Sequence, residues 1–254
     1  MMAAMIVWSG ITLSARAANE PIIAAAADLK FALDEIANQF RNNTGRIVKL
    51  SFGSSGNFTR QIEQGGPFEM FLSADESLVF KLSDQGLTLD RGALYAVGRI
   101  VIFIPQGSPL KPDGSLMDLV AATADKRLKR FTIANPEHAP YGQAAMQALQ
   151  KVGIWDKIGA SLVLGENAAQ ATHFALSGST QGGIIPYSLS LAPEVAKHGQ
   201  AALIHEHLHA PLRQRMVLLK RAGETARLFF AYIQSPPSRA SLKRYGFVLP
   251  DELP

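Results

Sequence analysis

The sequence contains no cysteine among its 254 residues. Disulfide bonds, thiolate metal sites and cysteine nucleophiles are therefore excluded, and so is a lipid anchor attached through cysteine. The absence of cysteine is compatible with an oxidising compartment but does not require one.

Charge is also scarce. Asp, Glu, Lys and Arg make up 18% of the chain, and the formal net charge is only +4. The densest basic stretch, Lys126-Arg127-Leu128-Lys129-Arg130, is typical of a solvated helix end, so we expect no nucleic-acid partner. With 47% hydrophobic residues, the chain is typical of a globular protein with one large domain or two lobes.

Common catalytic motifs are missing. The sequence has no Walker-type loop and no Gly-x-Gly-x-x-Gly fingerprint. Gly53-Ser54-Ser55-Gly56 does not have the Gly-x-Ser-x-Gly spacing of a nucleophile elbow. A hydrolase that uses Ser55 remains an alternative, but we expect a protein that is not an enzyme and has no cofactor.

The first eighteen residues have the pattern of a secretory signal. Residues 1–13 are mostly apolar and too few to span a bilayer as a helix, and small residues follow at the Ala15-x-Ala17 pair. This pattern predicts a signal peptide over residues 1–18, a mature chain that begins near Ala18 or Asn19, and export to the periplasm. The first residues carry no Lys or Arg, so either the true start lies upstream or the segment is not a signal.

Strands and helices alternate along the rest of the chain, which predicts an α/β fold. Apolar runs at residues 21–27, 47–52 and 68–72 are typical of strands, and a helix pattern follows each of them, so we expect a parallel sheet with helices on both faces. A second set has strands at residues 99–104, 131–134, 162–164 and 182–186, and the chain ends with a strand at 213–219 and helices at 224–233 and 238–245.

Four strand-to-helix junctions carry small or hydroxyl-bearing residues. Such junctions lie at the carboxyl ends of strands, where α/β proteins bind ligands, and each helix start offers unpaired N–H groups that favour an anion. The alternative is that these residues are ordinary helix caps. The junctions are Ala27-Asp28-Leu29, Ser54-Ser55-Gly56, Pro140-Tyr141-Gly142 and Asn167-Ala168-Ala169.

The order of several motifs resembles the periplasmic molybdate-binding proteins of bacterial molybdate ABC transporters. The resemblance implies a type II periplasmic binding fold, in which two α/β lobes joined by two crossover strands hold the ligand in a cleft. It implies a lobe I of residues 19–96 and 210–254 and a lobe II of residues 97–209. The motifs are Ala25-Ala-Ala-Asp28-Leu, Ser51-Phe-Gly-Ser-Ser-Gly56, Arg60-Gln-Ile-Glu-Gln-Gly65, Phe71-Leu-Ser-Ala-Asp75, Asn135-Pro-Glu-His-Ala-Pro-Tyr-Gly142 and Ser241-Leu-Lys-Arg-Tyr-Gly-Phe-Val-Leu249.

The same resemblance implies a monomeric receptor that binds molybdate or tungstate and delivers it to a membrane permease and its ATPase. The alternative ligand is a different oxyanion, including one that carries a proton, or another small anion. The ligand positions that the resemblance implies are listed here with their neighbours: Asp28, Leu29, Ser54, Ser55, Tyr141, Ala168, Pro186 and Tyr187.

Two of these positions depart from the family's pattern, because Pro186 has no N–H and Asp28 stands where a neutral donor is usual. A carboxylate would repel a dianion unless one of the two carried a proton. Asp28 has three interpretations: it caps its own helix, it accepts a proton from a protonated oxyanion, or the ligand has changed.

Other polar residues are weaker candidates. The His205-Glu-His207-Leu-His209 run could bind a metal cation, but a solvated edge is the simpler interpretation, and we expect no protein-bound metal. His138 is interpreted as a turn residue. Lys30 and Arg60 are interpreted as solvent-facing side chains that could raise the positive potential of the cleft.

Overall fold

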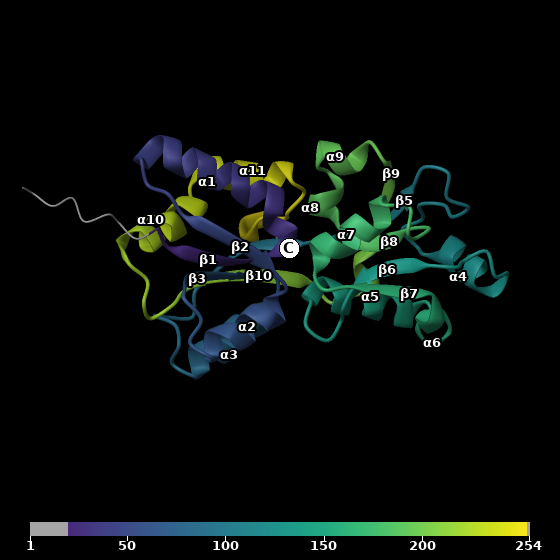
Figure 1. Cartoon of the computed structure of the whole chain (residues 1–254), viewed down its shortest axis with the longest axis horizontal. Helices are drawn as coiled ribbons and strands as arrows, with labels where there is room; N and C mark the ends of the chain where they lie inside the picture. Colours follow the sequence, from purple (N-terminus) through teal and green to yellow (C-terminus); the bar gives the residue numbers. More distant parts are fainter. Residues whose placement is uncertain (1–19, 253–254) are drawn as a thin grey trace, which may run out of the picture.

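A computed structural model describes residues 20–252 and shows two lobes, each built around its own sheet (Figure 1). The predicted signal peptide lies outside the described residues. The sheet of lobe I has the strand order β2-β1-β3-β10-β4. Its strands are β1 (Ile22–Ala26), β2 (Lys49–Gly53), β3 (Phe68–Ser73), β4 (Ala93–Gly98) and β10 (Leu212–Leu218).

Helices cover both faces of this sheet because the side chains of its strands alternate in direction. Ile23 of β1 packs with Leu33 and Phe229 on one face, whereas the adjacent Ala24 packs with Phe58 and Val79 on the other. The first face is covered by η1 (Ala27–Leu29), α1 (Lys30–Thr44), α10 (Glu224–Ile233) and α11 (Pro236–Arg244), and the second by α2 (Ser55–Glu63) and α3 (Glu76–Asp84) (Figure 1). The short η4 (Pro250–Glu252) ends the described chain.

Lobe II repeats the architecture with the strand order β7-β6-β8-β5-β9. Its strands are β5 (Ile100–Pro105), β6 (Phe131–Ala134), β7 (Leu162–Gly165), β8 (Gly183–Pro186) and β9 (Gly199–Leu203). Its helices are α4 (Met117–Ala124), α5 (Pro140–Lys151), α6 (Trp155–Ile158), η2 (Gly159–Ser161), α7 (Ala168–Leu176), α8 (Tyr187–Ser190), α9 (Pro193–Ala196) and η3 (Glu206–Leu208).

The α/β class is confirmed, and the three strands from which a parallel sheet was predicted are parallel to one another, although each complete sheet is mixed. β1 pairs in parallel with β2 and β3, whereas β10 is antiparallel to both β3 and β4. In lobe II, β5 is likewise antiparallel to β8 and β9. The reversed strands are β5 and β10, and the chain enters each of them directly after it passes from one lobe to the other. Neither strand is reached through a helical crossover within its own lobe, which parallel pairing would need.

The chain leaves the first sheet at Gly98, passes Arg99 and enters the second sheet at Ile100. It returns in the segment between β9 and β10. The two lobes are therefore joined by two segments of the chain. No helix of the described residues is long and apolar enough to span a membrane.

Candidate functional site

The four predicted helix starts meet at one enclosed pocket between the lobes. The pocket is narrow, with a cavity volume of about 10 Å³. η1 and α2 contribute Asp28, Ser54 and Ser55 from lobe I, while α5 and α7 contribute Tyr141 and Ala168 from lobe II. Small residues complete the wall, and within residues 20–252 no Lys or Arg lines it. The structure therefore brings together five of the eight residues that the sequence singled out.

The hydroxyl oxygen of Ser55 already accepts a hydrogen bond within the protein. Its side chain is fully buried, and its Oγ accepts a hydrogen bond from the backbone N–H of Ala74 at 3.0 Å. The hydroxyl proton remains available for a ligand in the pocket that Ser55 lines. Ser54 is instead the N-cap of α2, because its Oγ accepts from the N–H of Asn57 at 3.4 Å.

Asp28 belongs to a buried network that joins the two lobes. Its Oδ2 accepts hydrogen bonds from the Tyr141 hydroxyl at 3.0 Å and from Gln214 Nε2 at 2.7 Å. Gln214 Nε2 also donates to Tyr141 Oη at 3.0 Å, and its Oε1 accepts from the Tyr95 hydroxyl at 2.7 Å. Asp28 is 1% exposed, and its Oδ1 is a buried atom without a hydrogen-bond partner among the described residues.

The carboxylate of Asp28 turns to side chains on α5 and β10. Its own backbone N–H also interacts with it, which agrees in part with the interpretation that Asp28 caps its own helix. Burial raises the pKa of Asp28 to about 6, against the lowering effect of the bonds from Gln214 and Tyr141. Burial, together with the nearby Asp28 charge, raises the pKa of Tyr95 and of Tyr141 well above the usual value.

Because Gly98 has no side chain, there is room beside it for the Asp28 network. A Cβ at this position would lie 2.2 Å from Tyr141 Oη and 2.7 Å from Gln214 Nε2. Because Gly98 is also the last residue of β4, the glycine lets the phenol of lobe II approach the backbone at the point where the chain leaves lobe I.

Direct contacts between the lobes hold the pocket shut. The N–H of Gly56 donates to the carbonyl of His138 at 2.9 Å, and the Ser188 hydroxyl donates to the carbonyl of Asp28 at 2.8 Å. Asn57 on lobe I also donates to Glu166 on lobe II. The structure is therefore that of a closed form.

Ser54, His138 and Glu166 lie in a row at the edge of this closure. His138 Nδ1 is 3.0 Å from Ser54 Oγ, and its Nε2 is 3.5 Å from Glu166 Oε2. The order resembles a serine–histidine–carboxylate triad, but Ser54 Oγ is engaged as a helix cap and Glu166 is largely exposed. The row is better explained as a polar contact between the lobes than as a nucleophile with its base.

Three predicted positions do not line the pocket. Leu29 is fully buried in the core of lobe I, with Ile23 and Leu33. Pro186 ends β8, and the ring of Tyr187 stacks on the Arg99 guanidinium at 4.8 Å. A ligand role for these three residues stays a prediction.

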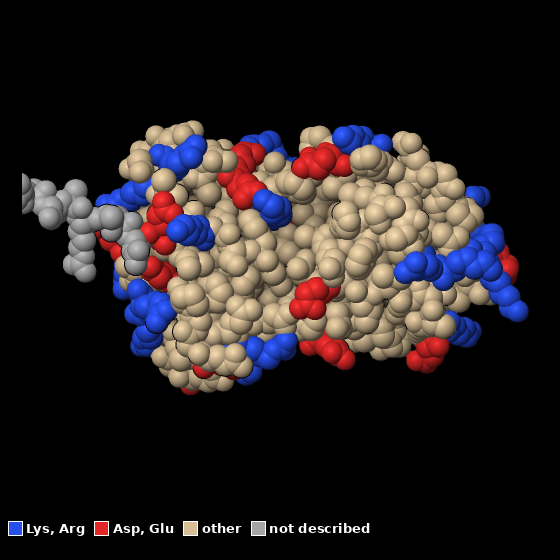
Figure 2. All heavy atoms as spheres, viewed as in Figure 1, with Lys and Arg blue, Asp and Glu red and all other residues tan. Residues whose placement is uncertain are grey.

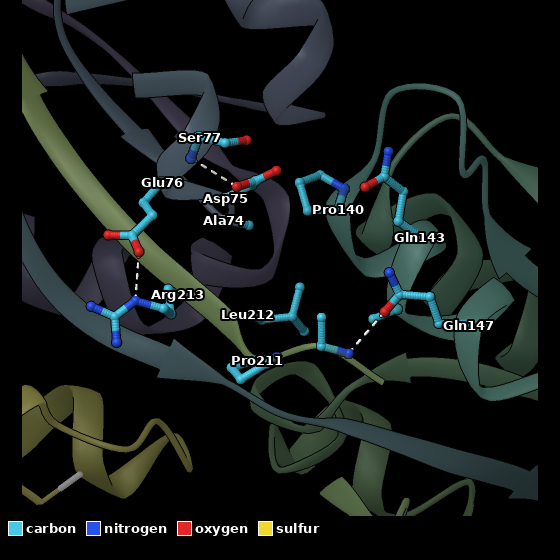
Figure 3. Close-up of a pocket in the computed structure, with 12 residues that line it drawn as sticks. Ala74, Asp75, Glu76, Ser77, Pro140, Gln143, Gln147, Pro211, Leu212 and Arg213 are labelled. Atoms are coloured by element: carbon cyan, nitrogen blue, oxygen red, sulfur yellow. Dashed lines mark hydrogen bonds and ion pairs between the residues drawn. The ribbon is translucent and has the colours of Figure 1, made fainter. Parts of the chain in front are cut away.

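A wider hollow of about 390 Å³ opens beside the enclosed pocket, and Ala74 and Pro140 line both (Figure 3). Its walls come from the start of α3 and from α5, and the chain approaching β10 runs between them (Figure 3). Glu76 accepts hydrogen bonds from Arg213 and Arg215 here, and these partners contribute to a lowered pKa of Glu76 despite partial burial. These ion pairs fix β10, which carries Gln214, against α3.

Charged side chains of both signs are scattered over the face drawn in Figure 2, with broad uncharged areas between them. Lys30 pairs with Asp34 and lies 5.0 Å from the Phe52 ring centroid, and Arg60 donates to Asn57. Neither cation lines the enclosed pocket.

The three histidines of residues 205–209 do not converge. The His205 and His207 rings are neighbours with centroids 5.5 Å apart, while His209 Nδ1 lies 2.8 Å from the carbonyl of Ala210. Within the described part of the chain, no group of three or more His, Cys, Asp or Glu residues is arranged to hold a metal ion.

Sequence reasoning missed Gln214, Tyr95, Gly98 and Ser188, and it assigned His138 to an ordinary turn. Gln214 carried a usable signal, since it alternates with Arg213 and Arg215 and so falls on the apolar face of the predicted strand, with Met216. Tyr95 and Gly98 are distant in sequence from the four helix starts, whereas His138 lies two residues before α5 and Ser188 lies in α8, beside two predicted positions. Contacts between the lobes bring His138 to Ser54 and Ser188 to Asp28.

The comparisons with known proteins agree with this geometry. Residues 22–248 match the profile of a family described as bacterial extracellular solute-binding protein. The molybdate-binding protein ModA of Rhodobacter capsulatus is 34% identical over 94% of this chain and 92% of its own length. The ModA protein of Azotobacter vinelandii is also 34% identical, over 95% of this chain and 94% of its own. The solved periplasmic molybdate-binding protein of Azotobacter vinelandii superposes with a TM-score of 0.81, at 29% identity, over 91% of this chain and all of that one.

Proposed function

Because this chain belongs to the bacterial extracellular solute-binding protein family, among the relatives of the molybdate-binding protein ModA, we propose that it binds molybdate or tungstate for an ABC transporter. The observation that carries the proposal is the convergence of four helix starts from two lobes on one closed pocket. Each start supplies N–H groups with no partner inside its own helix, and the helix dipole favours negative charge there.

The proposed ligand groups are the Ser55 hydroxyl and the N–H groups at the starts of η1, α2, α5 and α7. They come from residues around Asp28, Ser55, Tyr141 and Ala168. Because no Lys or Arg of the described chain lines the pocket, selectivity for an anion would come from its size and the directions of its oxygens. Pro186 and Tyr187 receive no support from the pocket's lining.

The mechanism is closure of the lobes over the anion. Tyr141 and Ala168 lie on lobe II and Asp28 and Ser55 on lobe I, so an anion between them stabilises the closed state relative to the open one. The permease would then recognise the closed form. We propose a monomer with lobe boundaries near residues 96/97 and 209/210, exported to the periplasm by a signal peptide at residues 1–18, that delivers its anion to a membrane permease and its ATPase.

Isothermal titration with sodium molybdate, sodium tungstate, sodium sulfate and sodium phosphate at pH 6 tests this function. We expect one site per chain for molybdate and tungstate and much weaker binding of sulfate and phosphate. Thermal unfolding provides the second readout, because an anion at a hundred times its Kd stabilises the folded state by about 2.7 kcal/mol. Absence of heat and of a thermal shift with both molybdate and tungstate would refute the proposal.

A further inference from the structure

Among the described residues, one carboxylate oxygen of Asp28 has no hydrogen-bond partner. Oδ2 receives two donors, the Tyr141 hydroxyl and Gln214 Nε2, while Oδ1 receives none and is buried. A buried acceptor without a partner costs about 1–3 kcal/mol, and more if it is charged. Asp28 also lines the pocket in which the anion is proposed to sit, so its unpaired oxygen needs an explanation that includes the anion.

The directions of the side-chain hydrogen bonds in the network leave no side-chain proton for Oδ1. The Tyr95 hydroxyl donates to Gln214 Oε1, which directs the two amide protons of Gln214 to Asp28 Oδ2 and Tyr141 Oη. The Tyr141 proton then goes to Asp28 Oδ2. Because both donors meet Oδ2, Oδ1 is the oxygen that can carry an additional proton without breaking a bond.

We propose that Asp28 is protonated on Oδ1 when the oxyanion is bound, so that the carboxylic acid donates a hydrogen bond to the anion. This inference rests on the proposed function. The proton comes from solvent, so each dianion binds together with one proton and the charge of the site changes by one unit rather than two. The ionised carboxylate of the free protein becomes the donor that the site otherwise lacks at this position.

The raised pKa of Asp28, about 6 in the anion-free form, supports this assignment. At pH 7.5 the free carboxyl is mostly ionised, and a dianion beside it raises its pKa further because like charges repel. Burial keeps the nearby Tyr95 and Tyr141 protonated, since the pKa of each is well above its usual value.

The remaining titratable groups on neighbouring elements point elsewhere. Lys30 on α1 pairs with Asp34, His173 on α7 is exposed, and Tyr187 on α8 stacks on Arg99. On β2, the neighbouring Lys49 is exposed and pairs with Glu20.

His138, beside Glu166 and Ser54, is the other titratable group near the pocket, and the test must separate it from Asp28.

Proton uptake on binding is measured by titrating the protein with sodium molybdate in two buffers of different ionisation enthalpy. We expect close to one proton per anion at pH 7.5 and almost none at pH 5, where Asp28 is already protonated. The association constant should fall about tenfold from pH 7 to pH 8, as linkage requires for one proton taken up.

Two variants identify the group. In Asp28→Asn, the amide oxygen can accept the bonds of Tyr141 and Gln214 while the amide N–H donates to the anion, so we expect binding with no proton uptake and an affinity independent of pH from 6 to 8. In His138→Gln, proton uptake at pH 7.5 should persist whatever the change in affinity.

The outcomes separate the inference from the function it builds on. Molybdate binding by the wild type without proton uptake at pH 7.5 would overturn the role of Asp28 and leave the receptor function intact. Uptake that disappears in His138→Gln, or that persists in Asp28→Asn, would assign the proton to another group and also overturn it. No molybdate binding at any pH would refute the proposed function itself.

Discussion

Replacing Asp28 by asparagine should stabilise the anion-free protein, and more so as the pH rises. The folded-state pKa of Asp28 is about 6, against 3.8 for an unperturbed Asp. A raised folded pKa means that the group stabilises the fold below pH 3.8 and that this contribution is lost as the pH rises through 6. The difference between these two pKa values corresponds to about 3 kcal/mol of unfolding free energy, at 1.36 kcal/mol per pKa unit. About 2 kcal/mol of this stabilisation is lost between pH 4.5 and pH 8.

Asp28→Asn removes this titration and keeps the shape of the side chain. The difference in unfolding free energy, variant minus wild type, should therefore increase by about 2 kcal/mol from pH 4.5 to pH 8. Urea unfolding at several pH values measures it, in buffers free of sulfate, phosphate and molybdate because bound anions would add their own stabilisation. Taking the difference cancels the contributions of the other groups that titrate in this range.

Asp156→Asn, on α6, is the matched control because it makes the same chemical change at an exposed carboxylate. The rise with pH should be specific to Asp28→Asn. A stability difference that stays flat from pH 4.5 to pH 8, or falls, would refute the reasoning that an ionised, partly unsatisfied carboxylate is buried at this site.

Two further substitutions test the pocket and its closure. Gly98→Ala places a Cβ 2.2 Å from Tyr141 Oη, so we expect it to displace the network and to weaken molybdate binding, measured by titration, by at least about tenfold, from the usual cost of overpacking. Gly159→Ala is the control, because a Cβ there would meet nothing within 4 Å. Equal affinities of the two variants for molybdate would contradict the role of Gly98. Ser55→Ala removes a donor to a charged ligand, worth about 1.5–3 kcal/mol, so the Kd for molybdate should rise about 10- to 100-fold; Ser51→Ala on β2 is the control, and an unchanged Kd in Ser55→Ala would remove Ser55 from the site.

The helix starts could be predicted from sequence because they depend on local chemistry. Ser54 before α2 and Asn167 before α7 are residues that accept hydrogen bonds at helix N-termini, and both do so in the structure. The alternation of apolar runs and helices likewise sufficed for the α/β class. Gly45, in the left-handed conformation with φ 70°, ends α1, which is a position where glycine is favoured after a helix.

The surroundings of Asp28 could not be predicted in the same way. A residue before a helix can turn its carboxylate toward its own backbone or toward another element, and the capping preference favours the first. The actual partners, Tyr141 and Gln214, are more than a hundred residues away and meet Asp28 only because the lobes close and β10 inserts between β3 and β4. That insertion depends on antiparallel pairing, which the alternation of strands and helices did not indicate.

The most direct test of the central claim is a crystal structure of the protein grown with sodium molybdate. We expect one molybdate in the enclosed pocket, with its oxygens about 3 Å from Ser55 Oγ, from Asp28 Oδ1 and from the backbone N atoms at Tyr141 and Ala168. A molybdate bound elsewhere while this pocket stays empty, or a bound anion whose oxygens avoid both Ser55 and the helix starts of lobe II, would contradict it.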